Sequence, residues 1–238
     1  MKKNNSNLKD LLLKAVQIIP VIFTVSMIIF CVAFIVKNDI SITNLDNLAV
    51  YFSGGVIAVS LMMILFNVVK SFALIITPVY LYALSGLIYE NIWLAVAVNF
   101  VGTFLSLILI YYLGRFMGME VVNKLKKRFK AIQKLENFTG ENAFAVVFVC
   151  KVGAILPSDL NSLVFGAMNL PFMPYFIASN ISLLILNVSW TLFTAKGDFT
   201  DPKSYLYILP AFIMAFAGTF YMSAKEKKKS SESKNENQ

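Results

Sequence analysis

The chain has 238 residues, of which 58% are hydrophobic and 14% are charged, and its mean hydropathy is +0.71. Apolar runs of about 20 residues, the length that crosses a bilayer as a helix, recur along it. This composition excludes an ordinary soluble domain and predicts an all-α polytopic membrane protein. The net charge of +8 is carried largely outside the apolar runs, so it indicates membrane topology and not a nucleic-acid partner.

The N-terminal part of the chain predicts one retained span. Residues 1–15 carry four lysines and one aspartate, and an apolar span follows at 16–36. The connector 37–47 has one lysine and two aspartates. By the positive-inside rule the N-terminus is cytoplasmic and the connector is external. No small-residue cleavage site follows the span, so we interpret it as a membrane helix and not as a signal peptide.

The next segment, 48–88, is apolar but broken by polar residues, glycine and proline. The span 91–113 follows it, and the loop 115–141 contains seven basic and three acidic residues. A loop with this excess of basic residues is expected in the cytoplasm. The segment 48–88 must therefore begin and end outside, either as a re-entrant pair of half-helices or as a full hairpin.

The segment 143–168 is a second interrupted apolar run. Each charge at the bilayer centre costs roughly 2.5–3.5 kcal/mol, and broken backbone at that depth must be buried in protein or line water. The pattern therefore predicts a re-entrant hairpin with a polar tip. The residues that interrupt the run are Lys151, Gly153, Pro157, Ser158, Asp159 and Asn161.

The second half of the chain mirrors the first. The outward span 172–195 is followed by the returning span 204–223 and by the cytoplasmic tail 224–238, which has five lysines and three glutamates. Each half is then a re-entrant hairpin followed by a span, in opposite orientations. Such an inverted repeat is typical of transporters whose binding site lies where broken helices meet.

Residues 119–138 combine apolar residues at helical spacing with many basic ones. One interpretation is an amphipathic helix that lies on the anionic inner leaflet. The other is a basic loop that only sets the topology. The apolar residues of this pattern are Val121, Leu125, Phe129, Ile132 and Leu135.

Two stretches carry a resemblance to a known family. The first, TPVYLYALSGLIYENIWLAVAVNFVGTFLSLILIYYLGRFMG (77–118), has a proline, a glycine eight residues later and a span that ends in Gly-Arg-x-x-Gly. The second is FVCKVGAILPSDLNSLVFGAMNLPFMPYFIAS (148–179). Together they resemble the VTT domain of the DedA family and of the SNARE-associated Golgi protein family, over about residues 48–195. Lys151 stands where that family usually has arginine, which keeps the charge but loses the planar guanidinium fork.

The resemblance implies lipid handling, such as flipping or scrambling of phospholipids or recycling of polyprenyl-phosphate carriers. Lysines near the hairpin tips would attract a phosphate, and the acid would pair with Lys151 or exchange a proton. Structural alternatives are an ion pair that only stabilises a broken helix, a snorkelling Lys70 and an anchoring Arg115. The candidate substrate-binding residues are Lys151, Asp159, Pro157, Asn161, Lys70 and Arg115.

Several functional classes stay open. The main hypothesis is lipid translocation, and the alternatives are a secondary transporter of ions or small solutes and a membrane factor that organises partners. No catalytic triad, histidine or cysteine cluster appears in the sequence, so we expect neither an enzyme nor a metal or other cofactor. The expected partners are membrane phospholipid or polyprenyl phosphate, with a homo-oligomer left open. The composition favours a bacterial plasma membrane, with a eukaryotic endomembrane as the alternative.

Overall fold

Every regular element in the described part of the chain is helical. The computed structural model describes residues 55–72, 77–126, 132, 142–153, 156–197 and 200–235, so the predicted first span and its connector lie outside the described residues. The helices are α3 (Val56–Ser71), α4 (Val79–Ile88), α5 (Ile92–Met117), α6 (Met119–Lys126), α8 (Ala143–Val152), α9 (Ser158–Ala167), α10 (Phe172–Lys196), the 3₁₀ helix η2 (Pro202–Tyr207) and α11 (Leu209–Asn235). The prediction of an all-α protein is confirmed for these residues.

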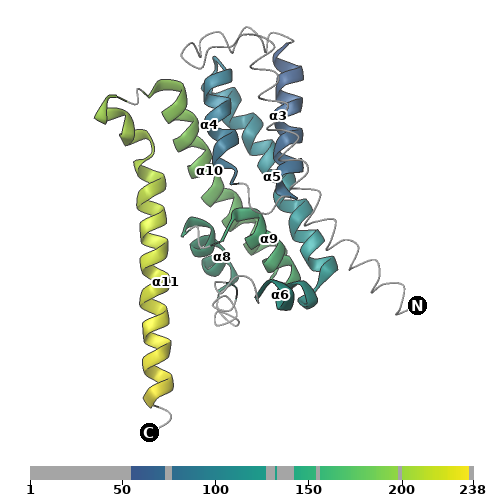
Figure 1. Cartoon of the computed structure of the whole chain (residues 1–238), viewed down its shortest axis with the longest axis vertical. Coiled ribbons are helices and arrows are strands. Elements are labelled where there is room, and N and C mark those ends of the chain that lie inside the picture. Colours follow the sequence, from purple (N-terminus) through teal and green to yellow (C-terminus); the bar gives the residue numbers. More distant parts are fainter. Residues whose placement is uncertain are drawn as a thin grey trace, which may run out of the picture.

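Two long helices, α5 and α10, contact each other and run in opposite directions (Figure 1). They have 26 and 25 residues and are apolar enough to cross a membrane. The N-cap of helix α5 is Asn91, whose side chain accepts hydrogen bonds from the backbone N–H groups of Trp93 and Leu94, as N-cap residues do. It ends at Gly118, where φ is +66°, a conformation that residues with a side chain rarely adopt. The sequence itself therefore limits the helix at both ends.

A pair of short helices precedes each long helix, α3–α4 before α5 and α8–α9 before α10. The first pair occupies the upper half of Figure 1 and the second pair the lower half. Helices α3 and α8 pack against the long helix of their own half, whereas α4 packs against α10 and α9 packs against α5. The two halves of the chain are therefore interlocked by the exchange of one short helix each.

Both exchanged helices approach their partners through a glycine. A Cβ atom on Gly86 of α4 would collide with the backbone carbonyl oxygen of Thr191, and a Cβ atom on Gly166 of α9 would collide with that of Tyr111. Gly166 lies 80 positions after Gly86, and the two residues that they meet, Tyr111 and Thr191, are also 80 positions apart. The same close crossing thus occurs twice, once in each half.

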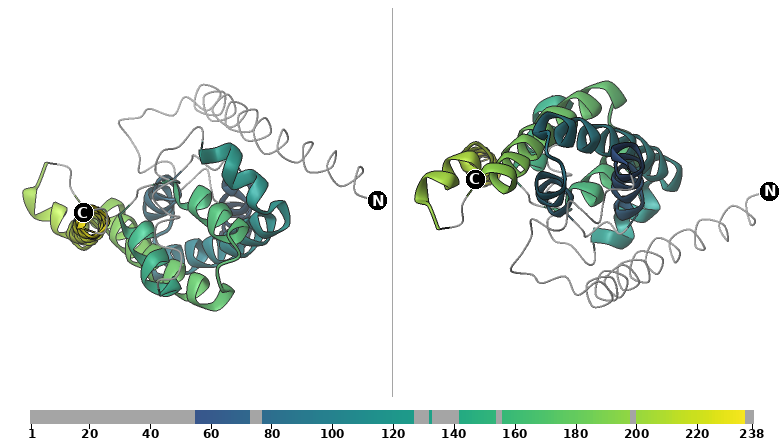
Figure 2. Two further views of the ribbon diagram at one scale, coloured as in Figure 1. Left: turned by 90° about the horizontal axis from the view of Figure 1, so that it is seen from below. Right: turned by 90° about the horizontal axis from the view of Figure 1, so that it is seen from above.

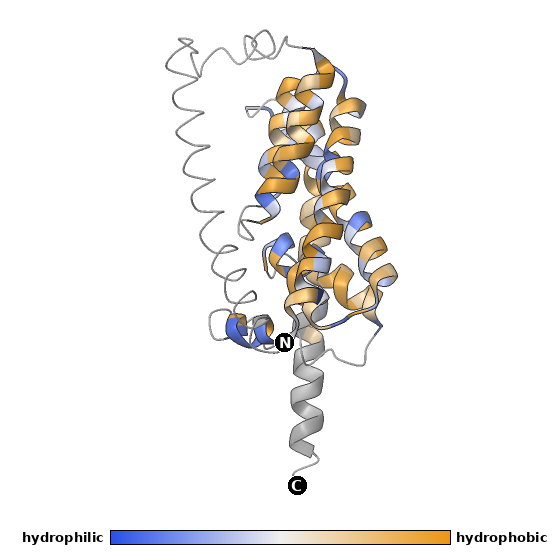
Figure 3. Cartoon of the chain, turned by 90° about the vertical axis from the view of Figure 1, so that its right-hand side faces the viewer, coloured by the Kyte–Doolittle hydropathy of each residue, from blue (hydrophilic) through white to orange (hydrophobic). Residues whose placement is uncertain are grey.

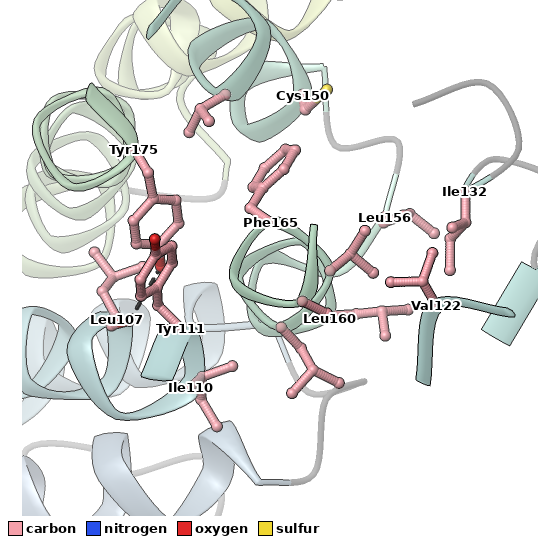
Figure 4. Close-up of a cluster of buried hydrophobic side chains, with 14 of the residues drawn as sticks. Leu107, Ile110, Tyr111, Val122, Ile132, Cys150, Leu156, Leu160, Phe165 and Tyr175 are labelled. Atoms are coloured by element: carbon pink, nitrogen blue, oxygen red, sulfur yellow. Dashed lines mark hydrogen bonds between the residues drawn. The ribbon is translucent and has the colours of Figure 1, made fainter. Parts of the chain in front are cut away.

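Helix α9 lies inside the molecule, because all of its side chains from Asp159 to Ala167 are buried. Figure 4 shows its Leu160 and Phe165 among apolar side chains from several other elements. On one side the Tyr175 ring stacks on the Tyr111 ring, with 4.6 Å between centroids. Helix α9 is therefore held by packing on every side.

The basic region 119–138 contributes to this core. Val122 and Ile132 are fully buried and lie beside Leu156 and Leu160 (Figure 4). Of the predicted apolar face, Ile132 is thus covered by protein, whereas the amphipathic-helix interpretation places it on the inner leaflet. Val122 is not part of that predicted face. Phe129 and Leu135 of the predicted apolar face lie outside the described residues.

Helix α11 stands at the side of the bundle, where it contacts α8 and α10 (Figures 1 and 2). Its apolar part is Leu209–Tyr221, so the predicted span 204–223 is divided between η2 and α11. Hydrophobic residues dominate the helices of the bundle (Figure 3). Many of them are exposed on its outer surface, among them Ile57, Trp93 and Phe216. A surface of this kind suits a lipid environment.

Candidate functional site

An ion pair joins the two short-helix pairs where they meet. The Nζ atom of Lys70, in the last turn of α3, lies 2.8 Å from Oδ2 of Asp159, in the first turn of α9. Lys70 is 5% exposed and Asp159 is 4% exposed. The bond connects residues that are 89 positions apart. It is therefore a tertiary contact between the two halves of the chain.

A second lysine lies next to this pair and is bound differently. The Nζ atom of Lys151 donates to the carbonyl oxygen of Ser158 at 2.6 Å, to its hydroxyl at 2.9 Å and to the hydroxyl of Ser162 at 2.7 Å. An ammonium group has three donors and no acceptor, and all three donors are used here. All of these partners are neutral. We call Lys70, Lys151, Asp159, Ser158 and Ser162 the charged cluster.

The arrangement differs from the expected pairing of Asp159 with Lys151. The carboxylate is bonded to Lys70 instead, and Lys151 is bonded to the two serines. The physical reason is the packing of α3 against α5, which brings Lys70 to the start of α9. Lys70 does not snorkel to a membrane surface in this structure, because the Lys70 side chain is buried in protein.

Pro157 and Asn161 shape the start of α9. Pro157 occupies the N-cap position, where no side chain caps the helix. The Asn161 amide donates to the carbonyl oxygens of Cys150 and Leu156, at 3.3 and 3.1 Å. Asn161 thus ties the end of α8 to the beginning of α9. These two candidates position the charged cluster and are not part of it.

Arg115 is not brought to the charged cluster. It lies near the C-terminal end of α5, is exposed and donates from Nη1 to the Tyr111 hydroxyl at 3.2 Å. That hydroxyl donates in turn to the carbonyl oxygen of Leu170. The arginine is thus held near the C-terminal end of α5, and its role as an anchor stays a prediction.

The structure also brings in residues that the sequence does not single out. Ser162 has no distinguishing local pattern, and only the fold places its hydroxyl on Lys151. The Tyr82 hydroxyl shares a hydrogen bond of 3.0 Å with the Thr103 hydroxyl, and both residues are buried. These contacts depend on which helices are neighbours, so periodicity and composition could not reveal them.

A second buried polar group links α4, α5 and α10 and carries no charge. The Asn187 amide donates to the carbonyl oxygen of Val96 at 2.9 Å, and its Oδ1 accepts from Asn99 at 3.2 Å and from Thr191 at 3.1 Å. Asn99 also donates to the Ser85 hydroxyl. We call Ser85, Asn99, Asn187 and Thr191 the amide network.

Comparison with known proteins places the chain in a family. The family model of the VTT domain matches residues 75–196, slightly more than half of the chain. The chain belongs to the VTT domain family. The resemblance inferred from the sequence is therefore confirmed. The VTT match includes Lys151 and Asp159, whereas Lys70 lies just before it.

One relative of this VTT-domain protein is the uncharacterized protein YqeD of Bacillus subtilis (strain 168), which is 27% identical over 124 residues. The alignment covers 51% of this chain and 57% of YqeD, so the chain spans little more than half of that relative. No solved structure matches the chain. The VTT family and the two apolar helices long enough to cross a bilayer support a membrane-associated function.

Proposed function

We propose that this VTT-domain protein translocates lipid across a membrane by giving the polar headgroup a path past the charged cluster. The observation that carries the proposal is Lys151, a buried ammonium whose bonded partners are all neutral. A buried charge is costly unless it is paired, and ionisable residues inside a membrane usually mark a transport pathway. The anion that pairs with the Lys151 ammonium would be a lipid phosphate.

The arrangement of helices supports a matching topology. In this proposal α3–α4 and α8–α9 are re-entrant hairpins that enter from opposite membrane faces, and α5 and α10 are full spans. The repeated glycine crossings, 80 residues apart, support an inverted repeat. The ion pair between Lys70 and Asp159 would then lie where the hairpin tips meet near the midplane.

The chemistry of lipid movement fits such a site. A headgroup needs polar partners while it crosses, and its acyl chains stay in hydrocarbon. The hydroxyls of Ser158 and Ser162 now accept from Lys151, and a hydroxyl can also rotate to donate. They would therefore help Lys151 to bind a phosphate. Phospholipid and polyprenyl phosphate both supply this group.

The cellular setting is part of the proposal. We infer a multi-pass protein of a bacterial plasma membrane with both termini in the cytoplasm, as the charge distribution along the sequence favours. The basic residues between 119 and 138 would then face the anionic inner leaflet. The proposed role is transport and not catalysis.

Reconstitution of the purified full chain into liposomes tests the proposal. A fluorescent phospholipid and a polyprenyl phosphate would be followed with and without a proton gradient. Hydrogen bonds to charged groups are worth about 1.5–3 kcal/mol, so Lys151→Met should slow lipid movement at least about tenfold. The matched control is Lys196→Met, because Lys196 is an exposed lysine at the end of α10.

The possible outcomes separate the functional classes. Equal rates for the two variants would remove the site from the proposal. Movement that needs a proton or sodium gradient and carries a small solute would support the secondary transporter, which an inverted repeat also serves. Failure of every substrate to move would favour a membrane-organising role.

A further inference from the structure

We propose that Asp159 selects lipid headgroups by charge, so that the site takes a phosphodiester with one negative charge and no cationic group. The inference rests on the proposed function and names the class of its substrate. It follows from the number of buried charges, since two lysines share one carboxylate. The ligand itself would supply the second negative charge.

The two lysines occupy equivalent places in the two halves. Lys70 is the next-to-last residue of α3, and Lys151 is the next-to-last residue of α8. They are 5% and 4% exposed. Their separation of 81 positions is close to the 80-residue shift of the glycine crossings. Asp159, in contrast, has Val79 at the position 80 residues earlier, so the carboxylate breaks the equivalence.

No other acid whose side chain the structure describes is buried beside the second lysine. The other carboxylates whose side chains the structure describes belong to Glu90, Glu120 and Asp201, and all three are exposed. Glu226 and Glu232 lie on α11 beyond its apolar part, Leu209–Tyr221. The short connections 73–76 and 154–155 contain no charged residue. Among the groups that the structure describes, the cluster therefore carries two positive charges and one negative charge.

The net charge determines which headgroup fits best. In a low-dielectric interior, any uncompensated charge carries a large desolvation penalty. A monoanionic phosphodiester brings the total to zero. A dianionic phosphomonoester would leave one negative charge in excess, and a zwitterion would bring a cation of its own into a site that is already positive. Like charges at close range disfavour binding.

The carboxylate also determines which lysine is available. Asp159 is bonded to Lys70 at 2.8 Å, whereas Lys151 is bonded to neutral serine oxygens that an anion could replace or share. Lys151 is then the lysine that binds the phosphate. Substitution of Asp159 by asparagine keeps the size and an acceptor for Lys70 but leaves both lysines without a counter-ion. The variant site should prefer two negative charges.

The test compares three tail-labelled lipids in liposomes at about pH 8, where a phosphomonoester has lost its second proton, with a pKa of about 6. The lipids are phosphatidylglycerol, phosphatidylcholine and phosphatidic acid. The unchanged protein should move phosphatidylglycerol at least about tenfold faster than the other two, the factor that about 1.4 kcal/mol produces. Asp159→Asn should raise the rate ratio of phosphatidic acid to phosphatidylglycerol at least about tenfold.

Two further variants complete the design. Asp201→Asn is the matched control, since Asp201 is an exposed aspartate, and it should leave all three rates unchanged. Lys70→Met removes one positive charge and frees Asp159 to pair with Lys151. It should therefore bring the rates for phosphatidylglycerol and phosphatidylcholine close together, and it serves as the test if Asp159→Asn does not fold.

The outcomes distinguish the inference from the function on which it rests. Equal movement of all three lipids by the unchanged protein would overturn charge selection and leave lipid translocation standing. If no lipid moves, the proposed translocation is wrong. The charge selectivity of the site is then tested separately, by the thermal stabilisation of the detergent-solubilised chain with short-chain forms of the same three lipids. Stabilisation by soluble glycerophosphoglycerol to the same extent would assign the phosphodiester alone, without acyl chains, as the ligand. Lack of stabilisation by any of them would overturn the inference.

Discussion

The charged cluster and the amide network are both buried between helices, yet they are built in opposite ways. In the amide network, neutral side chains bond to one another and to a backbone carbonyl, and Asn187 alone has three such contacts. The charged cluster has two ammonium groups and a single carboxylate, which bonds to Lys70, while Lys151 bonds to neutral serine oxygens. The first arrangement carries no charge and leaves only a neutral acceptor, Oδ1 of Asn99, without a hydrogen-bond partner among its members, whereas the second is one negative charge short.

This difference is the basis on which we propose a functional role for the charged cluster and a structural role for the amide network. A buried neutral network stabilises a single packing arrangement, because each member would lose its partners if the helices shifted. A buried excess charge makes the fold less stable unless something compensates for it. Burial of polar residues is therefore not enough to mark a site. In the proposed function, the unbalanced charge is what marks the charged cluster as the site.

The largest effect on folding is expected from the amide network. Asn187→Leu would remove three hydrogen bonds, to the Val96 carbonyl, Asn99 and Thr191, although Asn99 keeps its bond to Ser85 and Thr191 keeps its bond to the Tyr82 carbonyl. Each buried donor or acceptor that is left unsatisfied costs about 1–3 kcal/mol, against a total stability of about 5–15 kcal/mol for typical proteins. Most of the folded protein should be lost, as measured by size-exclusion chromatography in detergent.

The control for this substitution is Asn180→Leu in the same helix. The Asn180 amide donates only to the Phe176 carbonyl, one turn earlier in α10, so the yield should change little. Similar losses for both variants would show that α10 tolerates no leucine at a polar position. The contrast between the network and its surroundings would then be wrong.

A smaller effect on stability is expected in the charged cluster. Removal of one partner of a buried ion pair costs about 3–5 kcal/mol, whereas replacement of both by apolar residues is often neutral. Asp159→Leu should therefore lower the melting temperature more than Lys70→Met does, since it leaves two lysines unpaired. The double variant should regain part of the loss. Additive effects in this thermal-melting cycle would mean that the pair is not coupled.

The sequence predicts the location of the charged cluster for a local reason. Charges, glycine and proline inside an apolar run contradict a plain span, and the run that contains Lys151 and Asp159 shows this conflict within a few residues. The long helices are equally predictable, because length and hydropathy are local properties. The all-helical class and the VTT family follow from the same signals.

The partners within the site could not be predicted in this way. Asp159 bonds to a lysine 89 positions away, and Asn187 bonds to a carbonyl 91 positions away. Both contacts depend on the interlocked packing of the two halves. Arg115 matches a family motif but lies exposed near the end of α5. The motif could not predict this exposure, because a sequence motif does not state which face of a helix other helices cover. Tertiary packing decides these points.

The smallest predicted effect concerns the third partner of Lys151. The Ser162 hydroxyl accepts from Lys151 at 2.7 Å and donates to the Ser158 carbonyl at 3.0 Å. In Ser162→Ala the lysine keeps both oxygens of Ser158, and one hydrogen bond is worth about 0.5–1.5 kcal/mol, so phosphatidylglycerol movement should slow by about two- to tenfold. Ser182→Ala is the control, because this buried hydroxyl bonds within α10 to the Ser179 carbonyl and should leave the rate unchanged. If the two serine variants behave alike in the liposome assay, the hydroxyl of Ser162 takes no part in binding the headgroup, and the role of Lys151 would rest on Ser158 alone.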